Sequence, residues 1–150
     1  MITVGSPLGP LTVETANGAV TAIRFSGGAS DAPEPVAREA AGQLEAFFQG
    51  SRRSFDLPLA PAGTDFQKAV WTALAQIPYG ETVTYGELAA RIGRPGAARA
   101  VGRACGANPI PVILPCHRVV GKNGALTGYA GGLERKRLLL ALERDHRKGD

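Results

Sequence analysis

The sequence has few of the residues that would indicate an extracellular, membrane or metal-dependent protein. Only two cysteines occur in 150 residues, and their spacing matches neither a disulfide framework nor a structural zinc site. No apolar run approaches the roughly 18 residues that span a bilayer, and the N-terminus lacks the pattern of a signal peptide. We therefore expect a cytoplasmic protein with reduced thiols and no membrane partner.

The charges are unevenly distributed along a chain of otherwise ordinary composition. Hydrophobic residues make up 44% and charged residues 20% of the sequence, as in a typical globular protein. Residues 1–62 carry four basic and six acidic side chains, whereas residues 63–150 carry thirteen and seven. The second half could therefore face a polyanion such as nucleic acid, although many basic faces are merely solvated.

The first sixty residues read as a supporting α/β lobe. They contain no histidine or cysteine, and their acidic residues are scattered. The Pro/Gly-rich stretch "PLAPAG" then marks a boundary, which gives two domains, residues 1–60 and 64–150. Apolar alternation predicts strands at 1–6, 11–15, 19–26 and 53–60, and helix formers after two prolines predict a helix at 33–50.

The second domain begins with a helix that packs against a core. Thr64 and Gln67 form a capping box. The apolar stripe that follows predicts a buried face over residues 65–77. Its members are Phe66, Val70, Leu74 and Ile77, with Trp71 beside them.

Two short helices then form a helix-turn-helix signal. A second capping box opens residues 85–93, and a short break leads into "AARAVGRACGA" at 97–107. In that second helix Ala98, Val101 and Cys105 share an inward face. Arg99 and Arg103, four residues apart, share another face beside small residues. This pattern favours DNA contacts over solvated arginines, although by a small margin.

The remainder of the chain surrounds a cysteine with unusual neighbours. Residues 111–116, "PVILPC", predict an extended apolar run in which Pro115 keeps Leu114 out of the helical region. A glycine-dense loop at 121–132 could fold over a flat ligand. A last helix at 133–145 directs its charges mostly outward. Its expected inward residues are Leu133, Leu139, Leu140 and Leu142.

Cys116 is the candidate nucleophile, whereas Cys105 reads as packing. A thiol reacts as thiolate, so its pKa of about 8.5 would have to fall by about two units to ionise it mostly at pH 7. His117 is the credible base, although in an extended segment a turn or bridging water must connect it to the thiol. Either Glu143 or Glu134 could orient its imidazole.

The motifs "AARAVG", "NPIPVIL", "PCHRVV" and "GYAGGLERKRLLLALE" strongly resemble the O6-alkylguanine-DNA alkyltransferases, or methylated-DNA–protein-cysteine methyltransferases. The likeness runs continuously over about residues 64–144, and "SPLGPL" also resembles that family's start. It implies an α/β (α+β) fold: a small N-terminal RNase H-like α/β lobe and a mainly helical, winged helix-turn-helix-like C-terminal domain.

The resemblance also implies a mechanism. Cys116 would take the alkyl group from guanine O6 irreversibly, once per molecule, without a cofactor or metal. His117, held by Glu143, would accept the thiol proton through a water. Tyr85 would donate to guanine N3. Asn108 resembles a hinge residue that braces the segment before the active site.

Further roles carried by the resemblance concern the base and the DNA. Main-chain groups of Cys116 and Val119 would read the amine of the flipped base, the Ala130 N–H would bind O6, and Tyr129 would belong to the closing loop. Arg99 would fill the gap left by base flipping in double-stranded DNA, with the helix in the minor groove. The other expected DNA contacts are Thr84, Tyr85, Ala98 and Arg103.

Two other functions remain open from the residues. A non-catalytic lesion-sensing or regulatory DNA-binding protein would share the helix-turn-helix, but such relatives replace the cysteine that is present here. A Cys-His hydrolase would turn over without DNA and would leave Arg99 and Arg103 unexplained. For the leading hypothesis we expect a monomer that acts on DNA alone or cooperatively.

Overall fold

The computed structural model describes residues 1–28, 31–129 and 131–146. The chain divides into two compact units, Met1–Ala62 and Gly63–Asp150, and the fold mixes helices with small sheets. It is an α+β fold, as the sequence predicts. Within the described residues, no helix is both long and apolar enough to cross a membrane.

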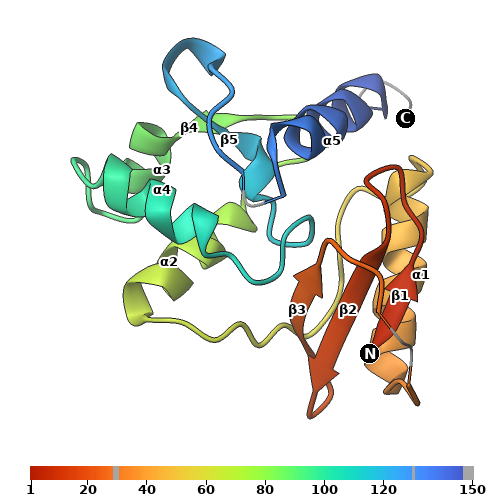
Figure 1. The fold of residues 1–150 in the computed structure, drawn as a ribbon. Helices are drawn as coiled ribbons and strands as arrows, with labels where there is room; N and C mark the ends of the chain where they lie inside the picture. The colour runs from red at the N-terminus through yellow and green to blue at the C-terminus, as the bar shows by residue number, and fades with distance from the viewer. Residues whose placement is uncertain (29–30, 130, 147–150) are drawn as a thin grey trace. The chain divides into compact units, whose positions relative to one another are not determined.

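In the first unit, one helix packs on a three-stranded antiparallel sheet (Figure 1). The strand order is β1-β2-β3, and Asn17 and Gly18, both at positive φ, make the tight turn between β2 and β3. The interface between helix and sheet is apolar and fully buried at Leu11, Leu44 and Phe47. The elements are β1 (Ile2–Val4), β2 (Leu11–Ala16), β3 (Ala19–Arg24) and α1 (Pro35–Phe48).

The strand predicted at residues 53–60 is reduced to an isolated bridge between Val20 and Leu59. Pro58 has no N–H to give to a ladder. The N–H of Asp56 donates to the side chain of Gln43 on α1 instead of to a strand. Residues 53–60 therefore make only two backbone hydrogen bonds to the edge strand β3, both with Val20.

The second unit is mainly helical, with one small parallel pair of strands, β4 and β5 (Figure 1). Trp71 is buried and its indole Nε1 donates to the carbonyl of Ala104 at 2.8 Å, which ties α4 to α2. The elements are α2 (Asp65–Leu74), β4 (Val83–Thr84), α3 (Tyr85–Arg91), α4 (Ala98–Gly106), η1 (Cys116–Arg118), β5 (Val119–Val120), η2 (Lys122–Gly124) and α5 (Leu133–His146).

Both predicted capping boxes are confirmed, and they fix where two helices begin. Thr64 accepts from the N–H of Gln67 at the start of α2, and Thr84 accepts from that of Glu87 at the start of α3. In each box the third helical residue also reaches back to the cap. The capping box at Thr84 places Tyr85 at the first position of α3.

Two expectations about the core are wrong in part. Phe66 is only partly buried, with the guanidinium carbon of Arg94 5.8 Å from its ring centroid. In α5, Leu139 is buried but Leu133 is 40% exposed. The inward face of α5 is partly polar, because Lys136 and Glu143 are buried there in place of leucines.

Candidate active site

The segment before Cys116 is a closed loop rather than the predicted extended run. The Asn108 side chain accepts from the N–H of Ile110 at 2.9 Å and donates to the carbonyl of Leu114 at 2.8 Å. The N–H of Leu114 donates to the carbonyl of Ile110, which closes the turn. Val112, buried within the loop, takes φ 73°, a conformation that a β-branched residue rarely adopts.

Asn108 therefore holds a strained turn, so its replacement should have a measurable cost. In Asn108→Ala, the buried N–H of Ile110 and the carbonyl of Leu114 would lose their partners. We expect the free energy of unfolding to fall by about 2 kcal/mol, as measured by urea denaturation at pH 7. A change below about 0.5 kcal/mol would contradict the bracing role.

Cys116 lies at the start of η1 and is 4% exposed. Its N–H donates to the carbonyl of Leu114, and the N–H of Arg118 donates to that of Pro115. This single 3₁₀ turn, and not an extended strand, carries Cys116 and His117. The turn brings the two residues into one local segment, but Nδ1 of His117 has no hydrogen bond to Cys116 among the described residues.

The resting thiol is not the thiolate that the sequence argument requires. Burial raises the pKa of Cys116, and hydrogen bonds from Asn108 and Tyr129 and the charge of Lys136 oppose burial without outweighing it. Burial likewise raises the pKa of Cys105, to about 12. Cys116 is therefore protonated at neutral pH, so a base must remove its proton as the thiol reacts.

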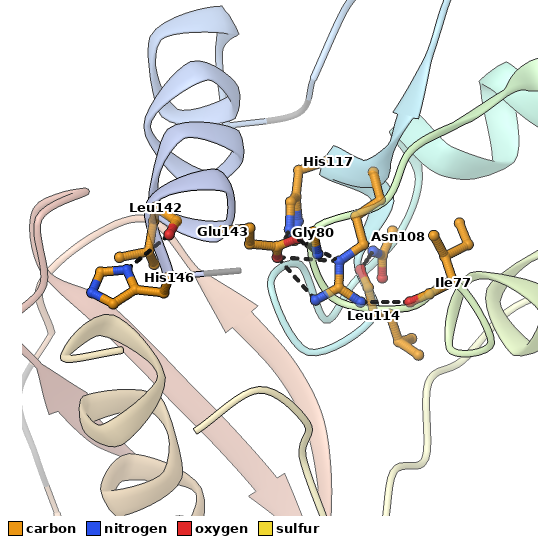
Figure 2. A network of polar contacts seen from close by, with 9 residues as sticks. Ile77, Gly80, Asn108, Leu114, His117, Leu142, Glu143 and His146 are labelled. Carbon is orange, nitrogen blue, oxygen red and sulfur yellow. Dashed lines mark hydrogen bonds and ion pairs between the residues drawn. The ribbon is translucent and has the colours of Figure 1, made fainter. Parts of the chain in front are cut away.

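His117 and Glu143 form a buried hydrogen-bonded pair (Figure 2). His117 is fully buried, and its Nε2 lies 2.6 Å from Glu143 Oε2 on α5. Burial lowers the pKa of His117 despite the carboxylate beside it, so the imidazole is neutral. Nε2 then carries the proton that Glu143 accepts, and Nδ1 is left as the basic nitrogen. Nδ1 is buried and has no hydrogen-bond partner among the described residues.

Of the two candidate orienters, the structure brings Glu143 to His117 and places Glu134 elsewhere. Glu134 is exposed and faces Arg137 at 3.7 Å. Glu143 also accepts from the backbone N–H of Gly80 at 3.0 Å (Figure 2). Burial raises the pKa of Glu143, but the hydrogen bonds from His117 and Arg118, together with the Arg118 charge, outweigh it and lower the pKa to about 2.

Arg118 is a site residue that the sequence argument did not assign. It is 6% exposed, its Nε and Nη2 donate to the Glu143 carboxylate, and its Nη1 donates to the carbonyl of Ile77 at 2.7 Å. Its guanidinium carbon also lies 5.6 Å from the Tyr79 ring centroid. The buried carboxylate is thus neutralised by a buried cation. The adjacency of Arg118 to His117 was the only available signal.

Lys136 is the second residue that the sequence argument missed. It is fully buried, and its Nζ donates to the carbonyls of Val119 at 2.7 Å and Thr127 at 3.2 Å. Burial lowers its pKa. Its position seven residues before Glu143, on the same helical face, was a usable signal. The Val119 carbonyl, predicted to read the base, has Lys136 as a partner.

Tyr85 and Tyr129 lie around the thiol. Tyr85 is half-buried at the start of α3, and its hydroxyl accepts from that of Thr127 at 2.8 Å. Burial raises the pKa of Tyr129 well above its ordinary value, and the neighbouring Cys116 contributes to this shift. Both phenols are therefore neutral and able to donate. Ala130 lies outside the described residues.

The predicted DNA-contacting residues occupy the helix-turn-helix. Arg99 and Arg103 on α4 are exposed, and Ala98, its first residue, is half-buried. Val101 and Cys105 are buried on the opposite side of α4, as predicted. Thr84 is half-buried, and its side chain is engaged in capping α3. Among the described residues, no group of three or more potential metal ligands occurs.

The fold and site define a helix-turn-helix protein with a buried cysteine–histidine–glutamate site. Residues 65–145 match the family of the 6-O-methylguanine DNA methyltransferase DNA-binding domain. The chain is 51% identical to the methylated-DNA–protein-cysteine methyltransferase of Methanosarcina acetivorans, over 92% of this chain and 94% of that protein.

Comparison with solved structures gives the same family. The structure is similar to the O6-methylguanine methyltransferase of Mycobacterium tuberculosis, with a TM-score of 0.88 and 50% identity over 99% of this chain and 94% of that one. It is equally similar to M. tuberculosis OGT in complex with DNA, at a TM-score of 0.88 and 51% identity over 96% and 92%. The chain belongs to the methylated-DNA–protein-cysteine methyltransferase family.

Proposed function

We propose that this protein repairs DNA by moving the alkyl group of an O6-alkylguanine to Cys116, irreversibly and once per molecule. The observation that carries the proposal is the His117–Glu143 pair. It leaves Nδ1, which is buried and has no hydrogen-bond partner in the described part of the chain, as the basic nitrogen of the residue that follows Cys116. Family membership supports the substrate class, and the placement of Cys116 and His117 in one turn supports their proposed roles as acceptor and base.

The proposed reaction balances with groups of this chain and one bridging water. As Sγ of Cys116 forms a bond to the alkyl carbon, the bond from that carbon to O6 breaks. The thiol proton passes through a water to Nδ1 of His117, and Glu143 stabilises the resulting imidazolium. The leaving guanine takes a proton at N3 from the Tyr85 hydroxyl. An alkyl thiolate is a poor leaving group from a thioether, so water does not displace it and the thiol is not regenerated.

The second unit would hold the whole reaction, and the first would support it. Cys116, His117, Glu143 and Tyr85 all lie within Gly63–Asp150 of one chain, which fits a monomer. In this proposal Tyr129 closes the base pocket and Ala130 binds O6. Thr84 and Ala98 contact the DNA, and Arg103 contacts a phosphate. The affinity for DNA therefore falls steeply as the salt concentration rises.

The function is tested by measuring the intact mass after mixing with a duplex that contains one O6-methylguanine. We expect a gain of one methylene unit that saturates at one equivalent, and peptide mapping should place it on Cys116. Tight lesion binding without a mass change would instead support a non-catalytic lesion sensor. Continuous turnover without DNA would support a hydrolase.

Arg99 is expected to matter only when a base must leave a duplex. In Arg99→Ala the exposed guanidinium that would fill the gap in the stack is lost. We expect transfer from duplex DNA to slow at least tenfold, while reaction with free O6-benzylguanine changes less than twofold. Single-turnover rates on both substrates measure this. Arg103→Ala is the comparison, because loss of a phosphate contact should weaken DNA affinity and its salt dependence. Equal slowing of Arg99→Ala on both substrates would exclude intercalation.

A further inference from the structure

We propose that Thr127 is a positioning residue that aims the Tyr85 hydroxyl proton at the leaving base and stabilises the phenolate as it forms. The inference rests on the proposed function, in which Tyr85 protonates guanine N3. It assigns a role to the glycine-rich loop between η2 and α5 other than covering the base.

The contact joins two segments that are distant in sequence. Thr127 Oγ1 donates to Tyr85 Oη at 2.8 Å, across 42 positions of the chain. A phenol oxygen has one proton to give and lone pairs that accept. Because Thr127 donates, the Tyr85 proton does not point at Thr127 and is free to be donated elsewhere.

Thr127 is itself held from two further sides. Its carbonyl accepts from the buried Lys136 Nζ at 3.2 Å, and the same Nζ binds the Val119 carbonyl of β5. Its methyl carbon is packed so closely that a Cβ added at Gly121 would lie 3.0 Å from it. The Lys136 contact therefore holds the Thr127 backbone, and the close approach of its methyl group to Gly121 restricts its side chain.

Tyr85 is fixed in a comparable way. The capping box of Thr84 and Glu87 defines its backbone at the start of α3. A Cβ added at Gly102 of α4 would lie 3.8 Å from two ring carbons of Tyr85, so the ring lies against this glycine. The helix-turn-helix and the glycine-rich loop thus meet at the hydroxyl pair of Tyr85 and Thr127.

The hydrogen bond from Thr127 makes Tyr85 a stronger acid than it would be without that bond. Burial raises the pKa of Tyr85, and the hydrogen bond from Thr127 opposes this increase. As Tyr85 gives its proton to N3, its oxygen gains negative charge and the bond from Thr127 becomes charge-assisted. A donor that strengthens as charge develops lowers the barrier to the reaction.

The test separates the hydroxyl of Thr127 from its methyl group. Thr127→Val keeps the methyl that packs on Gly121 and loses the donor, whereas Thr127→Ser keeps the donor and loses the methyl. Rates are measured with free O6-benzylguanine and with its 3-deaza analogue, in which a C–H replaces the N3 acceptor. With O6-benzylguanine we expect Thr127→Val to react about five- to tenfold more slowly than wild type. Thr127→Ser should react within about twofold of the wild-type rate.

The analogue provides a readout that loss of packing would not move. The 3-deaza analogue has no N3 to accept a proton from Tyr85, so Thr127 has no proton transfer to assist. Thr127→Val and wild type should therefore react with it at equal rates. If valine slows both substrates equally, or neither, the inference is wrong. Thr127→Ala is a second hydroxyl-free variant in case valine does not fold, and the same difference between the substrates is expected.

Tyr85→Phe distinguishes failure of the inference from failure of the proposed function. We expect it to slow benzylguanine transfer about a hundredfold, with no further effect of Thr127→Val in that background. A slow Tyr85→Phe beside an unimpaired Thr127→Val overturns only the role of Thr127. An unimpaired Tyr85→Phe removes the acid role of Tyr85 and the inference together, while a methyl group on Cys116 would still support alkyl transfer.

Discussion

Cys116→Ala is expected to abolish alkyl transfer while leaving the binding of alkylated DNA intact. Alanine removes the sulfur that accepts the alkyl group in the proposed reaction. Arg99 and Arg103 of α4, the proposed DNA contacts, are exposed and should be unaffected. Intact-mass measurement after mixing with O6-methylguanine duplex should show no gain, and a gel-shift assay should show retained affinity.

Cys105→Ala is the matched control, since both cysteines are buried thiols in the same unit. Burial raises the pKa of each thiol. Only Cys116 shares a turn with His117. Cys105→Ala should still gain one methylene unit per molecule. Methylation of Cys116→Ala at Cys105 would show that the acceptor is misassigned.

Glu143→Gln is expected to have the second largest effect, on stability and rate together. Glutamine keeps the shape of the side chain but removes the charge that faces the buried Arg118 guanidinium, and it presents an amide N–H₂ to donors. We expect the free energy of unfolding to fall by about 3 kcal/mol, because an uncompensated buried charge remains. We also expect transfer to slow about a hundredfold, because His117 loses the acceptor that fixes its tautomer.

Glu134→Gln is the control on the same helix. Glu134 is exposed, and its pair with Arg137 spans 3.7 Å on the surface, so its loss should change stability by less than 1 kcal/mol. Urea denaturation and single-turnover kinetics measure both effects. Similar rates and stabilities for the two variants would contradict the role given to Glu143.

The buried pair of His117 and Glu143 predicts that the protein loses stability at acid pH. The pKa of Glu143 falls from its ordinary value of 4.5 to about 2 on folding. Its contribution is therefore complete above pH 4.5 and is lost as pH falls towards 2. His117, whose pKa folding lowers, acts in the same direction, because the unfolded chain binds its proton first as pH falls below about 6.5. Wild type should lose more stability between pH 7 and pH 3 than Glu143→Gln does.

Much of the site could be predicted from local sequence because its signals are local. Capping boxes at Thr64 and Thr84 depend on residues three positions apart, and they appear where predicted. The inward face of α4 follows from helical periodicity. Other expectations failed because distant partners decide the outcome. The strand at 53–60 gave way to the Gln43 side chain, and the extended run before Cys116 gave way to the hydrogen bonds of Asn108.

Sequence by itself determined the family and the residues proposed to react, since "PCHRVV" and the helix-turn-helix are contiguous motifs. The tertiary structure alone decided the electrostatics, because pKa depends on burial and on neighbours from other elements. It selected Glu143 over Glu134 and brought Arg118 to the same carboxylate. It also buried Lys136 under the loop that holds Thr127 against Tyr85. A protonated resting thiol with a neutral histidine base follows from that packing, and composition and spacing could not have supplied it.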